Sequence, residues 1–408
     1  MFIERQLRKS FEAASGYFPA VLLIGPRQVG KTTFLRHISE PGRKYVTLDD
    51  MASRALANDD PTGFLERFSP PVLIDEIQYA PKLLNVIKIL VDEARFQDRE
   101  HSNGLFWLTG SQQFQMMKGV SESLAGRVAI LDLLGLSQAE LDGRQSQPFL
   151  PTNEFPGETT VRTPELFKRI WQGSFPEAYD ADETKRELFY SGYLQTYLER
   201  DVRELDQVTD LERFYKFLCS VAARTGQLLN CSELARDAEI SVGTAKNWLG
   251  ILEASHLVYL LQPYTSSLTA RLVKTPKLYM LDTGLCAYLT KWPSAEVLEA
   301  GAMAGVFFES WCFAEILKSY FNAGKSRPAF YFYRDKDQKE IDLIVEEAGT
   351  LYPVEFKKSA TPNIKDCRHF GALEKFKKPV GTGALVSMYP TWLPHPKNNC
   401  TFVPAPLI

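Results

Sequence analysis

The chain has 408 residues, with 47 Lys and Arg against 50 Asp and Glu, and a formal net charge of −3. Hydrophobic residues make up 45% and charged residues 24%, which is typical of a globular protein with about two to four domains. This balance excludes a polycation, so contact with nucleic acid would require a local basic patch. Residues 301–408 hold 14 Lys and Arg against 11 Asp and Glu, an excess of three positive charges.

The six cysteines are scattered singly and form no CxxC pair, which excludes a zinc framework and is typical of a reducing compartment. The first residues lack the apolar core of a signal peptide. The apolar runs are far shorter than the roughly 20 residues that span a bilayer. We therefore expect a soluble cytoplasmic protein with no membrane partner.

The first predicted elements are a buried strand at Ala20–Ile24 and a helix at Thr33–Ile38, joined by the loop GPRQVGKT. This loop has the pattern G-x-x-x-x-G-K-T of a P-loop, whose backbone N–H groups hold phosphate oxygens at the start of a helix. In such a loop Lys31 reaches the β- and γ-phosphates of ATP, and the Thr32 hydroxyl ligates Mg²⁺. The residues expected to bind the nucleotide here are Gly25, Pro26, Arg27, Gln28, Val29, Gly30, Lys31, Thr32 and Thr33.

A second apolar run, Pro71–Ile74, predicts a strand that ends in two acids. Asp75 is expected to hold Mg²⁺, and Glu76 is expected to polarise the water that attacks the γ-phosphate as a catalytic residue. The alternative is a strand that ends in solvated charge. The position of the run, about 45 residues after a P-loop, favours the catalytic interpretation.

A third predicted strand, Leu105–Leu108, ends in small polar residues, at the edge where an α/β sheet presents ligand groups. Thr109 or Ser111 is expected to sense the γ-phosphate, and Ser111 is counted with the nucleotide-binding residues. Arg127 precedes a further predicted strand and is a candidate arginine finger, a catalytic group that reaches the nucleotide of a neighbouring subunit. A structural salt bridge is the alternative for Arg127.

Together these segments resemble an AAA+ ATPase of the bacterial and archaeal branch whose members carry a C-terminal domain of unknown function. The resemblance extends over essentially the whole chain and implies ATP hydrolysis, Mg²⁺ and a homo-oligomer in which Arg127 acts in trans. Two stretches similar to the family's middle section have no evident chemistry; we interpret them as packing a helical lid on the nucleotide. Arg200 is a candidate sensor arginine of that lid, with a plain surface charge as the favoured alternative. The stretches that carry the resemblance are Gly25–Thr32, Leu73–Gln78, Leu108–Ser111, Ala125–Arg127, Gly173–Glu177 and Tyr197–Asp201.

The segment that starts at Asn230 predicts two helices joined by a short link, with Ser232 and Ser241 as the caps. Two predicted strands follow, at Leu257–Gln262 and Lys277–Leu281, so that a wing between them is expected. This order is that of a winged helix-turn-helix. Its second helix would present Thr244, Lys246 and Asn247 to DNA; a protein-binding or lid role is the alternative.

The C-terminal part predicts a helix that carries Glu309, a strand at Ala329–Arg334, and two strands that flank the turn EEAGT. Asp342 lies on the first of these two strands. Glu355 and Lys357 lie two apart on the second strand and therefore share one face. A helix is expected around residues 364–376.

This order, with an acid, twelve residues and then E-x-K, resembles the core of PD-(D/E)xK nucleases, although Ile341 stands where the motif has proline. Asp342, Glu355 and Glu309 would gather oxygen ligands around Mg²⁺ or Mn²⁺. Lys357 would orient or deprotonate a metal-activated water, so that Asp342, Glu355 and Lys357 are the candidate catalytic set. Folds of this kind also persist as binding platforms, so cleavage stays open.

The sequence thus predicts an α/β protein of four parts that binds ATP and Mg²⁺. The expected function is an ATPase that acts on nucleic acid, DNA more than RNA, with a nuclease-like domain that binds or cuts it. The alternative is an ATP-dependent oligomeric switch whose C-terminal domain is a non-cleaving platform for a partner. The four parts are a P-loop AAA+ domain at 1–135, a linker and helical lid at 136–205, a winged helix at 206–290 and a restriction-endonuclease-like domain at 291–408.

Overall fold

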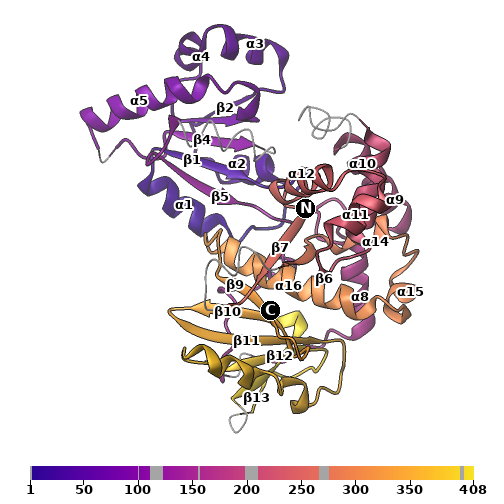
Figure 1. Cartoon of the computed structure of the whole chain (residues 1–408). Coiled ribbons are helices and arrows are strands. Elements are labelled where there is room, and N and C mark those ends of the chain that lie inside the picture. The colour runs from indigo at the N-terminus through magenta and orange to yellow at the C-terminus, as the bar shows by residue number, and fades with distance from the viewer. Residues whose placement is uncertain are drawn as a thin grey trace. The chain divides into compact units, whose positions relative to one another are not determined.

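The computed structural model describes residues 2–99, 101–110, 123–154, 157–197, 210–265, 275–395 and 399–408. The chain divides into two compact units, which Figure 1 shows as ribbons. The first unit holds residues 1–135 with the short segments 254–256 and 321–326. The second unit holds the rest of the chain.

The first unit is built on a five-stranded parallel sheet with the order β2-β3-β4-β1-β5. Three of its strands, β1, β3 and β4, are buried along their whole length, which is typical of a parallel sheet covered on both faces. Because the strands are parallel, the carboxyl ends of these three neighbours meet at one edge. The strands are β1 (Ala20–Ile24), β2 (Lys44–Thr47), β3 (Val72–Asp75), β4 (Phe106–Gly110) and β5 (Val128–Asp132).

Helices flank this sheet (Figure 1), and those between residues 51 and 97 share an apolar core with it. Helix α2 starts directly after Gly30, whose left-handed backbone (φ +88°) ends the loop that follows β1. The aspartates before α3 and α4 cap these helices through their side chains. The helices are α1 (Arg8–Tyr17), α2 (Lys31–Ile38), α3 (Met51–Asp59), α4 (Pro61–Arg67), the 3-10 helix η1 (Ile77–Tyr79) and α5 (Leu83–Gln97).

The second unit contains a nine-stranded mixed sheet with the order β13-β14-β12-β11-β10-β9-β7-β8-β6. Parallel pairing of β7 with β9 joins the antiparallel group β6, β8 and β7 to the larger group. The sheet is thus continuous across residue 290, where the sequence analysis placed a domain boundary. The strands are β6 (Gln227–Leu228), β7 (Val258–Pro263), β8 (Lys277–Met280), β9 (Phe330–Arg334), β10 (Glu340–Glu347), β11 (Thr350–Lys357), β12 (Gly383–Ser387), β13 (Leu393–His395) and β14 (Cys400–Pro404).

The longest helix of the second unit, α16, is buried around its whole circumference over residues 311–320. Burial on all sides places α16 in the core of this unit, where its buried charged side chains Glu315 and Lys318 pair with each other at 2.7 Å. No helix among the described residues is long and apolar enough to cross a membrane. The helices are α7 (Gln138–Leu141), α8 (Thr163–Gln172), α9 (Glu183–Thr196), α10 (Leu211–Ala222), α11 (Cys231–Asp237), α12 (Val242–Ala254), α14 (Thr283–Leu289), α15 (Ala295–Ala300), α16 (Ala304–Asn322) and the 3-10 helices η4 (Ile364–Cys367), η5 (Phe370–Phe376) and η7 (Ala405–Leu407).

The two helices predicted after Asn230 form as α11 and α12. Ser241 caps α12 as expected, because its Oγ accepts a hydrogen bond of 3.0 Å from the Thr244 N–H. The expected cap of α11 is wrong: the Asn230 side chain accepts from the Ser232 N–H at 3.1 Å, so the helix begins two residues earlier than a Ser232 cap implies. Residues 266–274, where a wing was expected, lie outside the described residues.

The helix predicted around residues 364–376 forms as two 3-10 helices, η4 and η5, and not as one α-helix. Its apolar residues recur every three positions, and side chains three apart lie on one face of a 3-10 helix. Three of them, Cys367, Phe370 and Leu373, are buried. The spacing of three therefore selects the tighter helix.

The GSFPE stretch packs elements of the second unit together. Gly173 ends α8 with a φ of +89°, and the Ser174 N–H and Oγ both donate to Asp282, at 2.7 and 2.8 Å. The same carboxylate accepts from Tyr190 on α9 at 3.0 Å and from the Leu285 N–H of α14 at 2.6 Å. One carboxylate therefore joins the ends or faces of three helices.

Candidate functional site

The loop between β1 and α2 has the backbone that the P-loop pattern predicts. Gly25 has a φ of +148°, and a Cβ added there would lie 2.1 Å from the carbonyl oxygen of Leu133, so no side chain fits. Gln28 and Gly30 also have positive φ, at +60° and +88°. Such left-handed turns before a helix N-terminus turn successive N–H groups inward and suit the loop to hold phosphate.

Lys31 lies across this loop with its side chain buried. Its Nζ donates hydrogen bonds to the carbonyl oxygens of Gly25 at 3.0 Å and Pro26 at 2.8 Å. The structure thus places a buried ammonium group in the predicted phosphate loop. The other expected residues lie in the same loop or in the first turn of α2: Arg27, Gln28, Val29, Gly30, Thr32 and Thr33.

Asp75, at the carboxyl end of β3, accepts three hydroxyl groups. Its Oδ1 accepts from Thr32 at 2.9 Å and from Thr109 of β4, and its Oδ2 accepts from the Tyr45 hydroxyl of β2 at 3.2 Å. Burial raises the pKa of Asp75, while the bonds from Thr109 and Thr32 oppose that rise. A threonine hydroxyl beside a carboxylate offers the hard oxygen atoms that Mg²⁺ prefers. The Mg²⁺ role of Thr32 and Asp75 stays a prediction.

Glu76 follows Asp75 with a left-handed backbone, at a φ of +59°. Its N–H donates to the Thr109 Oγ1 at 3.1 Å, and its carboxylate accepts from the Gln78 side-chain amide. Thr109, which is fully buried, therefore binds both acidic residues. Tyr45 and Gln78 were not singled out individually from the sequence, and Ser111 lies outside the described residues.

Arg127 is held by a carboxylate of the same unit. Its Nε and Nη2 contact the two Asp92 carboxylate oxygens at 2.6 and 2.9 Å, and its Nη1 donates to the Ala125 carbonyl at 3.0 Å. This is the salt bridge that the sequence analysis gave as the alternative. A role of Arg127 in trans stays a prediction, and Arg200 lies outside the described residues.

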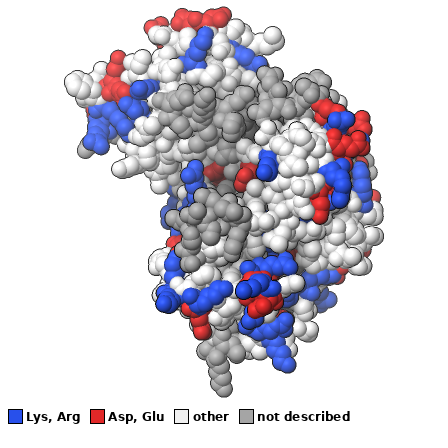
Figure 2. Space-filling model, in the orientation of Figure 1, with Lys and Arg blue, Asp and Glu red and all other residues white. Residues whose placement is uncertain are grey.

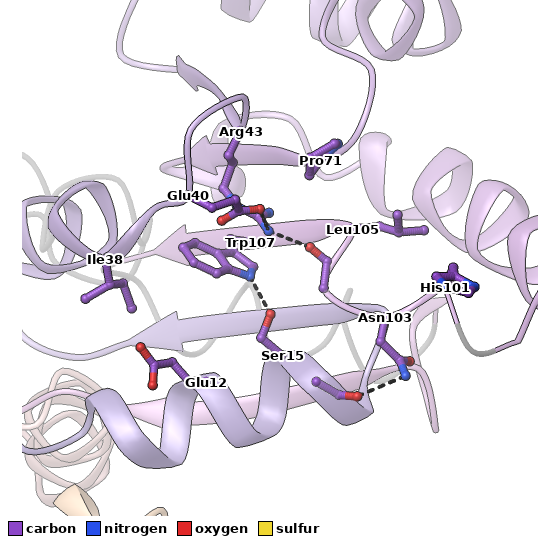
Figure 3. Close-up of a pocket in the computed structure, with 12 residues that line it drawn as sticks. Glu12, Ser15, Ile38, Glu40, Arg43, Pro71, His101, Asn103, Leu105 and Trp107 are labelled. Carbon is purple, nitrogen blue, oxygen red and sulfur yellow. Dashed lines mark hydrogen bonds and ion pairs between the residues drawn. The ribbon is translucent and has the colours of Figure 1, made fainter.

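A pocket of about 520 Å³ lies at the other edge of this sheet (Figure 3). It is lined by residues that precede β3 and β4, such as Pro71 and Leu105, whereas Asp75 lies at a carboxyl end. The Arg43 guanidinium lies 3.7 Å from the centre of the Trp107 ring, and the Trp107 Nε1 donates to Ser15 at 2.8 Å. The pocket is therefore distinct from the candidate nucleotide site.

In the second unit, the predicted C-terminal residues lie on neighbouring elements. Lys357 and Glu355 share one face of β11, and their Nζ and Oε1 are 2.8 Å apart. Asp342 lies on the adjacent strand β10, and its Oδ2 accepts from the Phe356 N–H at 3.0 Å. Burial, followed by the charges of Glu309 and Glu355, raises the pKa of Asp342 well above its usual range.

A lysine that the sequence analysis did not single out lies among these acids. Lys277 of β8 is buried, and its Nζ lies 2.7 Å from Glu309, 2.9 Å from Glu340 and 3.7 Å from Asp342. Burial alone would lower the pKa of Lys277, but Tyr279 and the three carboxylates raise it well above its usual value. This shift favours the charged form of Lys277.

These carboxylates do not fit a divalent metal in this arrangement. Glu309 accepts from both Lys277 and the Tyr279 hydroxyl, the latter at 2.7 Å, and Glu355 pairs with Lys357. Across the described ranges, no group of three or more His, Cys, Asp or Glu side chains is arranged to hold a metal ion. The Mg²⁺ or Mn²⁺ site expected from Glu309, Asp342 and Glu355 therefore has an ammonium group among its acids.

Three family profiles match consecutive parts of the chain. Residues 17–142 match an AAA domain, residues 163–296 match a domain of unknown function (DUF8612), and residues 304–408 match a domain of unknown function (DUF4143).

The chain is similar to proteins of bacteria and archaea. It is 29% identical over 373 residues to the uncharacterized protein Rv2008c of Mycobacterium tuberculosis, a match that covers 89% of this chain and 76% of the relative. It is 24% identical over 362 residues to the uncharacterized protein MJ1637 of Methanocaldococcus jannaschii, which covers 80% and 70%. Among solved structures, the Walker-type ATPase PABY2304 of Pyrococcus abyssi matches 71% of this chain and 96% of its own, with a TM-score of 0.41 and 16% identity.

The profile match agrees with the strand order, the P-loop backbone and the meeting of Thr32 with Asp75. The expected resemblance to an AAA ATPase with a C-terminal domain of unknown function is confirmed at this level. The chain carries a P-loop ATPase domain of the AAA type followed by DUF4143.

Proposed function

We propose that the chain hydrolyses ATP at the carboxyl edge of the first sheet, with Mg²⁺ held by Thr32 and Asp75. The observation that carries this proposal is the hydrogen bond of 2.9 Å between these side chains. Thr32 lies on α2, the helix after the P-loop, and Asp75 lies at the carboxyl end of β3. Bound Mg²⁺ would neutralise charge on the phosphates. Lys31 would bind the β- and γ-phosphates, and the loop N–H groups would orient them.

Glu76 would orient the attacking water. Its carboxylate accepts from Gln78, and its backbone N–H is fixed by Thr109, so its place relative to Asp75 is set by neighbouring strands. A positioned carboxylate next to the metal-binding acid is the arrangement that water attack on a phosphate requires.

Measurements of nucleotide binding and of phosphate release distinguish the roles of Glu76 and Asp75. Glu76→Gln should bind ATP with unchanged affinity but release phosphate at least about 100-fold more slowly. Asp75→Asn should lose the Mg²⁺ dependence of ATP binding. Lys82→Ala, which alters an exposed lysine of the same unit, is the control and should match the wild type. Wild-type turnover by Glu76→Gln would contradict the assignment.

We further propose that ATP hydrolysis serves an action on nucleic acid, with DNA preferred to RNA. The order α10, β6, α11, α12, β7 and β8 is that of a winged helix-turn-helix, which supports contact of α12 with a duplex. Lys246 and Asn247 are exposed on α12. A second support is the segment 364–378, which holds five Lys and Arg against two Asp and Glu.

Basic side chains also gather at the lower end of the second unit in Figure 2, the end where Figure 1 draws the C-terminal strands. Phosphate contacts of this kind would make affinity fall with salt. Lys246→Glu and the pair Lys365→Glu and Lys377→Glu should weaken the binding of a labelled DNA duplex about 10-fold or more and reduce its salt dependence. Lys82→Glu in the first unit is the matched charge reversal and should bind like the wild type.

The second candidate function is an ATP-dependent switch whose C-terminal domain holds a protein partner without cutting. The observation that favours it is that Lys277 lies 2.7 Å from Glu309 and 3.7 Å from Asp342, two carboxylates of the expected nuclease centre. Unchanged DNA affinity in all the charge reversals above would favour the switch.

A further inference from the structure

The acidic cluster of the second unit is assembled from three elements around one ammonium group. Glu309 comes from α16, and Glu340 and Asp342 come from one face of β10, two residues apart. Lys277 enters from β8, which is 63 residues away from Glu340 in sequence. All four residues belong to the same compact unit.

The Lys277 side chain is buried within this cluster and does not lie on its surface. It is 5% exposed, and the Tyr279 hydroxyl, on the same face of β8, donates to the Glu309 oxygen that Lys277 also contacts. Asp342 is buried, and Glu309 and Glu340 are partly exposed beside it; carboxylates gathered in this way favour a cation nearby, because an uncompensated buried charge is strongly unfavourable. Lys277 supplies that cation.

The same oxygen atoms would suit a hard divalent cation. Mg²⁺, Mn²⁺ and Ca²⁺ bind carboxylate oxygens at roughly 2.0–2.6 Å. An ammonium group already lies 2.7 and 2.9 Å from two of these oxygens, and two cations at such spacing repel each other in a buried site. The cluster can therefore hold the lysine or a divalent ion, but not both.

We infer that this cluster is a latent divalent-cation site in which the Lys277 ammonium stands in place of the metal. The native C-terminal domain then binds no divalent ion between Glu309, Glu340 and Asp342 and cuts no phosphodiester by metal-dependent chemistry. The cluster instead ties β8 to α16 and β10. This inference does not depend on ATP hydrolysis at the P-loop.

Titration of nucleotide-free full-length protein with Mn²⁺, followed by electron paramagnetic resonance, tests the inference. Lys277→Ala should bind one more Mn²⁺ per chain than the wild type. The double variant Lys277→Ala, Asp342→Asn should lose that extra ion. Lys277→Arg, which keeps the positive charge, should bind no extra ion. Mn²⁺ at the P-loop contributes equally to all four proteins and cancels.

Lys318 offers a matched control. It is also a buried lysine of the second unit, and its Nζ lies 2.7 Å from Glu315 and donates to the Leu136 carbonyl at 2.9 Å. Lys318→Ala should lower the melting temperature by about 10 °C, as should Lys277→Ala, because each leaves a buried carboxylate without its partner. Mn²⁺ should restore the melting temperature of Lys277→Ala by most of that loss and leave Lys318→Ala unchanged.

A folded Lys277→Ala that gains no Mn²⁺ would overturn the inference. So would a wild-type protein that binds Mn²⁺ and loses it in Asp342→Asn. The comparison of wild type with Asp342→Asn decides the question by itself if Lys277→Ala does not fold: equal Mn²⁺ binding supports the inference, and Asp342-dependent binding contradicts it. Neither readout involves ATP, so a failure here leaves the proposed ATPase activity untouched.

Discussion

Asp75 is fixed by hydroxyl groups from three different elements, the start of α2, strand β2 and strand β4. Each hydroxyl compensates part of the cost of burying the carboxylate, because a buried acceptor without partners is expensive. Thr109 does more than the other two, since its hydroxyl also accepts the Glu76 N–H. One buried threonine therefore contacts both acids of the candidate site.

Replacing Thr109 tests this dependence. Thr109→Val keeps the shape but removes the hydroxyl, so Asp75 loses a donor and the Glu76 N–H loses its acceptor. We expect kcat for ATP hydrolysis to fall roughly 10- to 100-fold, because small displacements of catalytic groups cost about this much. Thr109→Ser restores the hydroxyl and should regain most of the rate. Equal kcat values for Thr109→Val and the wild type would show that the threonine positions neither acid.

The P-loop residues could be predicted because the pattern encodes a local backbone: glycines at positive φ followed by a helix start. Tyr45 and Lys277 could not be predicted in this way. Each reaches its partner across a sheet, 30 residues away for Tyr45 and Asp75, and a spacing motif does not describe such pairs. Lys277 also begins a buried strand, where a lone lysine gives no signal that it meets acids.

At the scale of elements, the junction of α8, α9 and α14 explains why the GSFPE stretch has glycine and serine. A Cβ added to Gly173 would lie 2.2 Å from the Tyr190 hydroxyl and 2.7 Å from Asp282. The backbone φ of +89° is also unfavourable for any other residue. The stretch is therefore accounted for by packing within the second unit.

Gly173→Ala should lower the free energy of unfolding by about 2–4 kcal/mol, from overpacking and backbone strain together. Urea unfolding followed by far-ultraviolet circular dichroism measures the change. Gly192→Ala is the matched control, because Gly192 lies inside α9 with nothing within 4 Å of an added Cβ. That variant should gain about 0.5–1 kcal/mol. A loss of stability in Gly192→Ala as large as in Gly173→Ala would contradict this account.

Some helices and strands could be predicted from capping residues and apolar patterns in the sequence. Helix α12 has the bounds that its cap and apolar pattern predict. The helix expected at 364–376 takes the 3-10 form, because its apolar residues recur every three positions. The parallel pairing of β7 with β9 could not be predicted, since nothing in two short strands specifies that partner.

At the scale of the whole molecule, the open question is whether copies of the chain act on one another's nucleotides. Arg127 forms a two-point salt bridge with Asp92, but that pair is partly exposed, with 27% and 45% of the two side chains accessible. Pairs of this kind contribute only about 0–1 kcal/mol to stability. The salt bridge therefore holds Arg127 weakly enough to leave a second role open to test.

Two variants separate the alternatives. If Arg127 acts in trans, Arg127→Ala should lose ATP turnover at every protein concentration while it keeps ATP binding. Asp92→Asn should keep turnover, and its specific activity should rise with protein concentration as in the wild type. If Arg127 forms only the salt bridge, both variants will hydrolyse ATP at the wild-type rate. That result would exclude Arg127 as an arginine finger.

The central claim is that the first unit hydrolyses ATP and that this hydrolysis serves an action of the protein on nucleic acid. The most direct measurement is the rate of phosphate release with Mg²⁺, with Lys31→Ala as the inactive control, alone and with single-stranded DNA, duplex DNA, branched DNA and RNA. We predict Mg²⁺-dependent release that Lys31→Ala abolishes, and stimulation by a form of DNA that stays uncut. Release at the same rate in the wild type and Lys31→Ala would contradict the ATPase, and release indifferent to every nucleic acid would contradict the proposed action on DNA.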